Sequence, residues 1–221
     1  FCLSRGLGDV YKRQQQDIPF LVIEPAKGEY KHVFGNRQDV CVLGTNDRFT
    51  ELLNINPFSF PEQTHVLEHV DRLIEVFNVC WPMYAAMPAI LKDAVLRSYE
   101  ACGWDLRDST STLSSPLFPT FADLLTQLES VIAQSAYSDE MKSNYTGALV
   151  TRVRSMVNGL NGQIFAADEI SNADLFDRNV IIDLSRVGSQ ETKSLLMGLL
   201  IIRLGEYRAE QMLMNQPLKH I

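Results

Sequence analysis

The stretch FLVI at residues 20–23, which is followed by Glu24, decides the fold of this chain. A short, wholly apolar run of this kind is typical of a strand that is buried on both faces of a parallel sheet. VCVL at residues 40–43 repeats the pattern, and VII at residues 180–182 repeats it once more before Asp183. The three runs together predict an α/β fold built on a parallel sheet.

Two acidic residues, Glu24 and Asp183, directly follow two of these predicted strands. Ligands of open parallel sheets bind outside the carboxyl ends of the strands. We therefore expect Glu24 and Asp183 to be catalytic residues. For Glu24 an alternative stays open, in which its carboxylate is solvated or accepts hydrogen bonds from the amides of the next turn.

Helical patterns fill the chain between the second and third predicted strands. Apolar residues with 3.6-residue spacing begin near Val66 and again near Ile90. Thr120 and Asp123 have the spacing of a capping box, and Ser138 is suited to cap a further helix. The Ser-, Thr- and Pro-rich residues that follow the second helix are expected to form a linker at 107–119, and Ser189 is expected to cap a buried helix after the third strand.

This order of elements predicts an α/β core that is interrupted by a large all-α insertion. We expect the first part of the core at residues 15–60, the insertion at 61–165 and the return to the core at 166–221. Residues 1–14 lack the apolar centre of a signal peptide and resemble a translated sequencing-adapter remnant, so we treat them as an artefactual leader.

The composition favours a soluble globular protein, since 46% of the residues are hydrophobic and the formal net charge is −7. That charge argues against a surface built as a whole to bind nucleic acid, so any DNA contact is expected to be local. The four cysteines are far apart, so neither a zinc site nor a disulfide framework is expected. No apolar run approaches the length of a membrane span, and we expect a cytoplasmic location.

Two weaker patterns have ordinary structural explanations. His65 and His69 lie four residues apart and would share a helix face, but without a third ligand we favour an amphipathic helix over a metal site. A basic face could meet a DNA backbone near Tyr145, although charged residues on a helix usually form its solvated face; its residues are Lys142, Arg152 and Arg154.

Three segments resemble the HerA-type branch of the FtsK–HerA P-loop ATPases. They are FLVIEPAKGEYKHVFG at residues 20–35, LGTNDRFTELLNINPFSFP at 43–61 and NVIIDLSRVGSQETKSLLMGLLIIRLGEYR at 179–208. In this sequence the matching elements are Glu24-Pro25, Gly28-Glu29-Tyr30 and Asn56-Pro57-Phe58. The resemblance extends over residues 19–220.

The resemblance implies a partial RecA-like domain of a homo-oligomeric ring, a hexamer, that uses ATP and Mg²⁺ to move double-stranded DNA. A nuclease or another protein is a further candidate partner. The turn with Lys27, Gly28 and Glu29 would face the nucleotide side of the sheet and bind the cofactor, although a solvated loop stays open. Arg186 would be the arginine that stabilises transition-state charge on the γ-phosphate of a neighbouring subunit.

The sequence departs from the family pattern because it contains no G-x-x-x-x-G-K-[ST] loop and no Asp-Glu magnesium strand. We interpret the chain as an internal fragment of a DNA-translocating motor. Two alternatives remain: a protein-interaction scaffold with a decayed nucleotide site, or a ring ATPase of a secretion or conjugation channel.

We predict that the 221-residue chain alone hydrolyses no ATP, because it has no phosphate-binding loop. Release of inorganic phosphate in the presence of Mg²⁺ measures this directly. Magnesium-dependent turnover that survives substitution of Glu24 would contradict the prediction.

Overall fold

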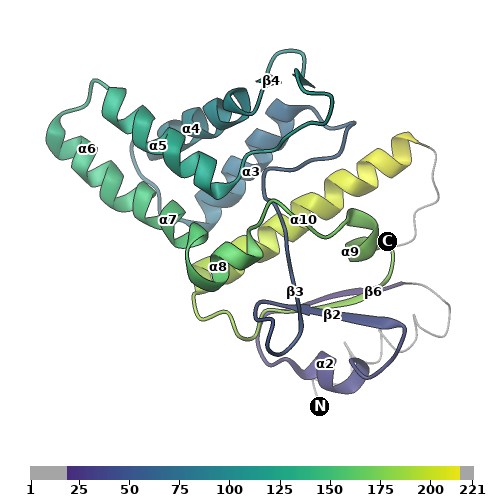
Figure 1. Cartoon of the computed structure of the whole chain (residues 1–221). Helices are drawn as coiled ribbons and strands as arrows, with labels where there is room; N and C mark the ends of the chain where they lie inside the picture. The colour runs from purple at the N-terminus through teal and green to yellow at the C-terminus, as the bar shows by residue number, and fades with distance from the viewer. Residues whose placement is uncertain (1–18, 215–221) are drawn as a thin grey trace. The chain divides into compact units, whose positions relative to one another are not determined.

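The computed structural model describes residues 19–214 of the protein. The described residues form two compact units (Figure 1). One comprises residues 19–53 and 170–214, and the other comprises residues 54–169. The expected leader at 1–14 and the last residues of the chain, from 215 onward, lie outside the described residues.

A four-stranded parallel sheet forms the centre of the first unit. Its strands lie in the order β1 (Leu21–Glu24), β6 (Asn179–Asp183), β2 (Val40–Gly44) and β3 (Glu51–Leu52). The parallel pairing of the three apolar runs confirms the fold class predicted from the sequence. Strand β3 was not predicted, because a pair of residues is too short to show a period.

One face of the sheet is covered by helix α2 (Glu29–Phe34), as Figure 1 shows. Val22, Ile181 and Val42 are neighbours in the strand register and therefore point to the same face. They pack in one apolar cluster with Phe34 of the helix. The helix thus shares a core with strands β1, β6 and β2, which fixes the segment between β1 and β2 against the sheet.

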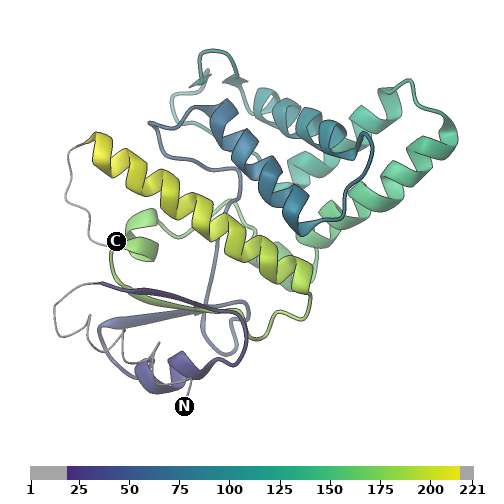
Figure 2. The same ribbon diagram turned by 180° about the vertical axis from the view of Figure 1, so that it is seen from behind.

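Helices α9 (Asn172–Phe176) and α10 (Gln190–Leu213) lie on the opposite face in both views (Figures 1 and 2). The expected cap of α10 is confirmed, since the Ser189 side chain accepts a hydrogen bond from the amide of Thr192. No helix of the described residues is both long and apolar enough to cross a membrane.

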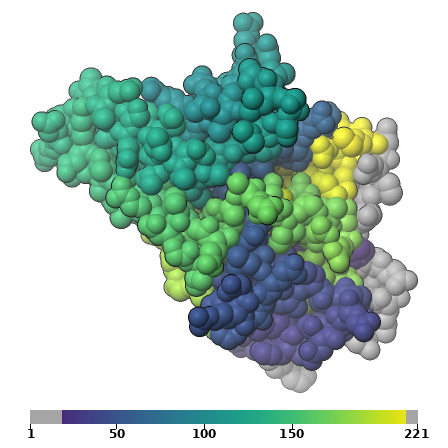
Figure 3. Space-filling model, viewed as in Figure 1, coloured from purple at the N-terminus to yellow at the C-terminus, as the bar shows by residue number. Residues whose placement is uncertain are grey.

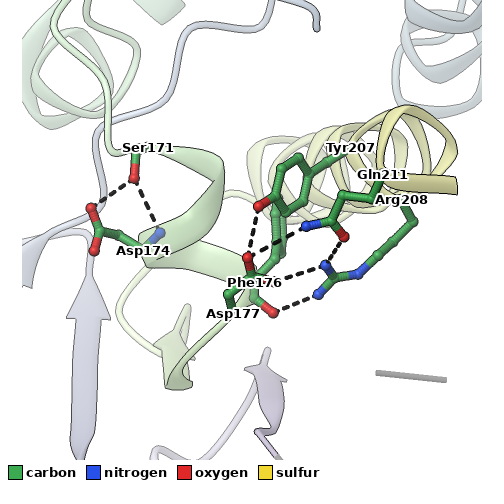
Figure 4. Close-up of polar contacts among 7 residues, drawn as sticks. All are labelled: Ser171, Asp174, Phe176, Asp177, Tyr207, Arg208 and Gln211. Carbon is green, nitrogen blue, oxygen red and sulfur yellow. Dashed lines mark hydrogen bonds and ion pairs between the residues drawn. The ribbon is translucent and has the colours of Figure 1, made fainter. Parts of the chain in front are cut away.

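A polar network joins α9 to α10 (Figure 4). The Asp177 carboxylate accepts hydrogen bonds from the Tyr207 hydroxyl at 2.7 Å and from Arg208 at 2.8 Å, and Arg208 also donates to the Phe176 carbonyl at 2.6 Å. Burial, followed by the hydrogen bond to Asp177, raises the pKa of Tyr207 to about 12. The network sits just before β6 in the chain and so anchors the start of that strand to α10.

The second unit is helical. The short antiparallel hairpin of β4 (Trp104–Asp105) and β5 (Thr110–Ser111) overlaps the linker predicted at 107–119, and the teal segment that contains it projects at the top of Figure 3. The strands of this hairpin are too short and too polar to show a periodic pattern of apolar residues in the sequence. The helical segments are α3 (Val66–Cys80), α4 (Met87–Ala101), α5 (Phe121–Gln134), α6 (Asp139–Tyr145), the π-helical turn η1 (Thr146–Val150), α7 (Thr151–Val157) and α8 (Gly159–Ile164).

Two predicted helix starts in this unit are confirmed. Thr120 and Asp123 form a complete capping box at the start of α5, and the Ser138 side chain accepts a hydrogen bond from the amide of Met141 in α6. The single helix expected after Ser138 is instead interrupted by η1, which contains Gly147. Glycine weakens helix continuity, and π-helical turns typically occur as single turns inside α-helices.

Aromatic rings fill the core of the helical unit. Phe58 is fully buried and contacts Tyr99 and Phe121 edge-on. The Asn56 side chain holds this turn by accepting a hydrogen bond from the Phe58 amide at 3.1 Å, and the Tyr99 hydroxyl donates to the Phe58 carbonyl at 2.5 Å. The Asn56-Pro57-Phe58 motif is therefore a turn that inserts an aromatic ring into the core.

We predict that Tyr99→Phe lowers the free energy of unfolding by about 1–3 kcal/mol, because the Phe58 carbonyl loses a buried donor while the ring still fills its site. Tyr84→Phe is the matched control, since Tyr84 is 59% exposed. Urea denaturation followed by circular dichroism measures both. Equal stability of the two variants would show that the hydroxyl contributes nothing to the fold.

Candidate functional site

The carboxyl edge of the sheet brings the two predicted catalytic acids side by side. Glu24 ends β1 and Asp183 ends β6, and the two residues are partners in the parallel register. Both are buried, with relative exposures of 7% and 3%. Buried carboxylates must be paired or hydrogen-bonded, so their partners define this site.

Glu24 accepts hydrogen bonds from the backbone at the start of α2. Its Oε1 receives the amide of Glu29 at 2.7 Å, and its Oε2 receives the amide of Tyr30 at 3.1 Å. The first amides of a helix have no partner within the helix, and a carboxylate supplies one. This geometry matches the alternative in which Glu24 binds the amides of the next turn. Its catalytic role stays a prediction.

Asp183 forms an ion pair with Lys31 of α2, whose Nζ lies 2.6 Å from Oδ2. Its Oδ1 accepts the backbone amide of Ser185 at 2.9 Å. Burial by itself raises the pKa of Asp183, but hydrogen bonds from Lys31 and Ser185, together with the Lys31 charge, outweigh burial and hold the pKa below its ordinary value. Asp183 is therefore an ionised carboxylate fixed at the end of β6.

Gly28 permits the tight approach of the turn to this pair. Its φ of +67° lies in the left-handed region that side chains disfavour. A Cβ atom placed there would lie 3.1 Å from the Ser185 hydroxyl and 3.2 Å from Cε of Lys31. A role of Gly28 in binding a cofactor stays a prediction.

The other residues predicted to bind the cofactor lie on the solvent side of this turn. The Lys27 side chain is 70% exposed, and its Nζ lies 3.6 Å from Oε1 of Glu29. Such an exposed pair contributes little to stability. Lys27 and Glu29 are therefore available to a ligand or to another subunit, although nothing in their geometry identifies which.

Arg186 lies outside the cluster that joins Glu24, Lys31 and Asp183. Its guanidinium carbon lies 3.6 Å from the centroid of the Phe49 ring, and both side chains are exposed. Phe49 belongs to the loop between β2 and β3, at the same carboxyl edge of the sheet. The predicted role of Arg186 toward a neighbouring γ-phosphate stays a prediction.

Sequence reasoning missed Lys31 and Phe49. Lys31 stands one residue after the GEY element, and only the helical turn of α2 brings its Nζ back to Asp183. Phe49 carried a weak signal, since it is an isolated aromatic residue within the polar sequence TNDRFT. Both contacts link segments far apart in the chain, which no local pattern encodes.

Several weaker candidates have structural roles. His65 caps α3 through Nδ1, and His69 is buried with Nε2 at 3.1 Å from the Pro57 carbonyl. Arg154 pairs with Glu129 at 2.7 Å, and Tyr145 is buried, so the Tyr145 ring is not presented to a nucleic-acid base. Within residues 19–214, no three His, Cys, Asp or Glu side chains come together to bind a metal ion.

The two acids at the sheet edge are engaged by partners within the fold. Both oxygens of Glu24 accept backbone amides, and both oxygens of Asp183 are engaged by Lys31 and Ser185. Each carboxylate oxygen has two lone pairs, so these hydrogen bonds use part of its accepting capacity. The two carboxylates thus fix the geometry of the edge.

Comparison with known proteins finds likenesses among solved structures rather than among sequences. No protein-family model matches the sequence, and no curated protein matches it. The fold is similar to that of VirB4 from Thermoanaerobacter pseudethanolicus, with a TM-score of 0.57 and 18% sequence identity. The match covers 86% of this chain and 49% of VirB4, so the chain spans about half the length of that protein. This likeness concerns the fold alone, which combines a parallel sheet with an all-helical unit.

We predict that Lys31→Met lowers the free energy of unfolding by about 3 kcal/mol near neutral pH, because it leaves the Asp183 carboxylate buried without its cation. The wild-type pKa of Asp183 is depressed, so the ion pair stabilises the fold above the unfolded-state pKa and is lost as the pH falls through the folded-state pKa. The variant should therefore lose most stability near pH 6 and less near pH 3. Thermal unfolding at both pH values measures this.

Lys92→Met is the matched control for this experiment. Lys92 forms an ion pair with Asp71 at 2.5 Å, but the two side chains are 43% and 63% exposed. An exposed pair contributes about 0–1 kcal/mol, so Lys92→Met should change stability little at either pH. A Lys31→Met variant as stable as Lys92→Met at pH 6 would contradict the assigned role of the buried pair.

Proposed function

We propose that this chain supplies part of the nucleotide-hydrolysing core, and the helical insertion, of a HerA-type ring ATPase that moves double-stranded DNA. The observation that carries the proposal is the pair of buried acids at the carboxyl edge of a parallel sheet. The likeness to VirB4 supports the ATPase part of the proposal at the level of fold.

The sheet edge supports this function through its charge. Asp183 is held ionised by Lys31, and Glu24 organises the turn that carries Lys27 and Glu29. In phosphoryl transfer, catalysis consists mainly of positioning and electrostatic stabilisation. We propose that Asp183 and Glu24 position the water and phosphate side of the site. ATP, Mg²⁺ and a hexameric ring belong to the same proposal.

A second candidate is a ring ATPase of a secretion or conjugation channel. The likeness to VirB4 favours it, because VirB4 is among the solved structures with a similar fold. Fold alone does not decide the cargo. Stimulation of ATP turnover by duplex DNA distinguishes the two candidates, since a DNA-translocating motor should be stimulated and a protein-exporting one should not.

ATP hydrolysis by the complete reading frame that contains this sequence tests the proposal. We predict Mg²⁺-dependent turnover that Asp183→Asn lowers by roughly a hundredfold, a loss typical of removing one positioned electrostatic group. Because Asp183→Asn also leaves Lys31 unpaired, the Asp183→Asn/Lys31→Met double variant is needed. It should regain stability without regaining activity.

Glu140→Gln is the matched control, since Glu140 is an exposed acid of the helical unit. It should leave both stability and turnover unchanged. No turnover by the wild-type protein would contradict the motor and favour the scaffold alternative. Full turnover by the double variant would contradict the role proposed for Asp183 while leaving the motor intact.

A further inference from the structure

A stacked pair of Phe49 and Arg186 lies exposed at the carboxyl edge of the sheet. The Phe49 side chain is 56% exposed, and the Arg186 guanidinium lies over its ring at 3.6 Å. An exposed phenyl ring gains nothing from burial, so its place in a polar loop is not explained by the core. The pair instead presents a planar, cationic surface to solvent.

The loop that carries Phe49 is held by hydrogen bonds. The Asn46 side chain accepts the amide of Arg48 at 3.0 Å, and the Asn46 carbonyl accepts the amide of Phe49 at 3.1 Å. The loop is closed at its base by the amide of Leu53, which donates to the Gly44 carbonyl at 2.7 Å. Phe49 is therefore presented by an ordered turn, and little ordering cost is left for binding.

Hydrogen bonds also fix the backbone around Arg186, whereas its guanidinium donors have no acceptor within the described residues. The Ser185 amide binds Asp183, and the amide of Val187 donates to the Leu184 carbonyl at 3.1 Å, which fixes the backbone on both sides of Arg186. Within residues 19–214, no carboxylate or carbonyl accepts a hydrogen bond from its guanidinium. Arg208 differs, because its cation–π contact with Tyr207 is longer, at 5.2 Å, and Asp177 pairs with its charge.

These observations suit a ligand that is both planar and anionic. Nucleobases stack on aromatic rings and on arginine planes, and phosphates accept the hydrogen bonds of a guanidinium. Of the neighbouring side chains, Arg48 is exposed and Lys27 is 70% exposed at the same edge, and each can meet a phosphate. A purely acidic peptide would use the charges but not the phenyl ring.

We propose that Phe49 and Arg186 form a stacking platform for a nucleobase, with the Arg186 donors binding an adjoining phosphate. The base can belong to a mononucleotide or to a nucleic-acid strand, and both present the same chemistry. The platform reassigns Arg186 from the γ-phosphate of a neighbouring subunit to the phosphate that adjoins the stacked base. It does not depend on whether the edge near Asp183 takes part in ATP hydrolysis.

Binding measurements on the 221-residue chain test the platform. Each probe that carries a base is compared with a partner probe that lacks it. The strand probe is a fluorescein-labelled oligodeoxythymidylate, and its partner has the same backbone with abasic sites. The mononucleotide probe is ATP, and its partner is inorganic tripolyphosphate. We expect at least one base-bearing probe to bind roughly 5- to 20-fold more tightly than its base-free partner, which is the lower range for one stacked base.

Variants test whether the platform causes the tighter binding of the base-bearing probe. Phe49→Ala should abolish the preference for the base-bearing probe, and Phe49→Trp should keep it. Arg186→Ala should weaken base-bearing and base-free probes alike, because it removes a phosphate contact. Tyr84→Ala removes an aromatic side chain of similar exposure from the helical unit and should change nothing. All are surface changes with small effects on stability.

The outcomes distinguish a mononucleotide from a nucleic-acid strand as the source of the base. They also distinguish the platform from a contact between copies of the chain. A preference seen only with ATP assigns a mononucleotide, and one seen only with the strand assigns a nucleic acid. Equal binding of base-bearing and base-free probes, or an unchanged preference in Phe49→Ala, would overturn the platform. So would a Phe49→Ala variant that changes only the oligomeric state, because the pair would then be a contact between copies of the chain.

Discussion

The ion pair between Lys31 and Asp183 is the interaction on which the carboxyl edge of the sheet depends. It links α2 to the central strand β6 at 2.6 Å, and the side chains are 19% and 2% exposed. Removing two charges from water is costly, and only a close, hydrogen-bonded geometry offsets that cost. The Ser185 amide supplies the additional hydrogen bond that Asp183 requires. Glu24, capping α2 from the adjacent strand, completes the same construction.

This construction constrains what chemistry the edge can perform. Both acids are buried and already accept hydrogen bonds within the fold. A ligand therefore meets the edge first through side chains that are exposed to solvent. Lys27 and the Phe49–Arg186 pair are such groups. We therefore infer two separate roles at this edge. Its geometry is fixed by Glu24, Lys31 and Asp183, and the exposed side chains around them contact nucleotide or nucleic acid. The VirB4-like fold is compatible with that division.

Local patterns in the sequence predicted the sheet well, because strands buried on both faces are wholly apolar and end at polar residues. They also predicted the helix caps, since capping depends on residues three positions apart, such as Thr120 and Asp123. They did not predict Lys31–Asp183 or Phe49–Arg186, which join residues more than a hundred positions apart. Such contacts arise from the order of strands in the sheet, and that order is not written in any local period.

The ionisation of Asp183 is the most direct measure of the central claim. Carboxyl carbon chemical shifts followed through an acid titration give its pKa in the folded protein. The account predicts a midpoint below the ordinary aspartate value of about 3.9, and a higher midpoint in Lys31→Met, because the charge and hydrogen bond of Lys31 no longer oppose the effect of burial. A wild-type midpoint at or above the ordinary value, unchanged by Lys31→Met, would show that the ion pair does not hold this edge together.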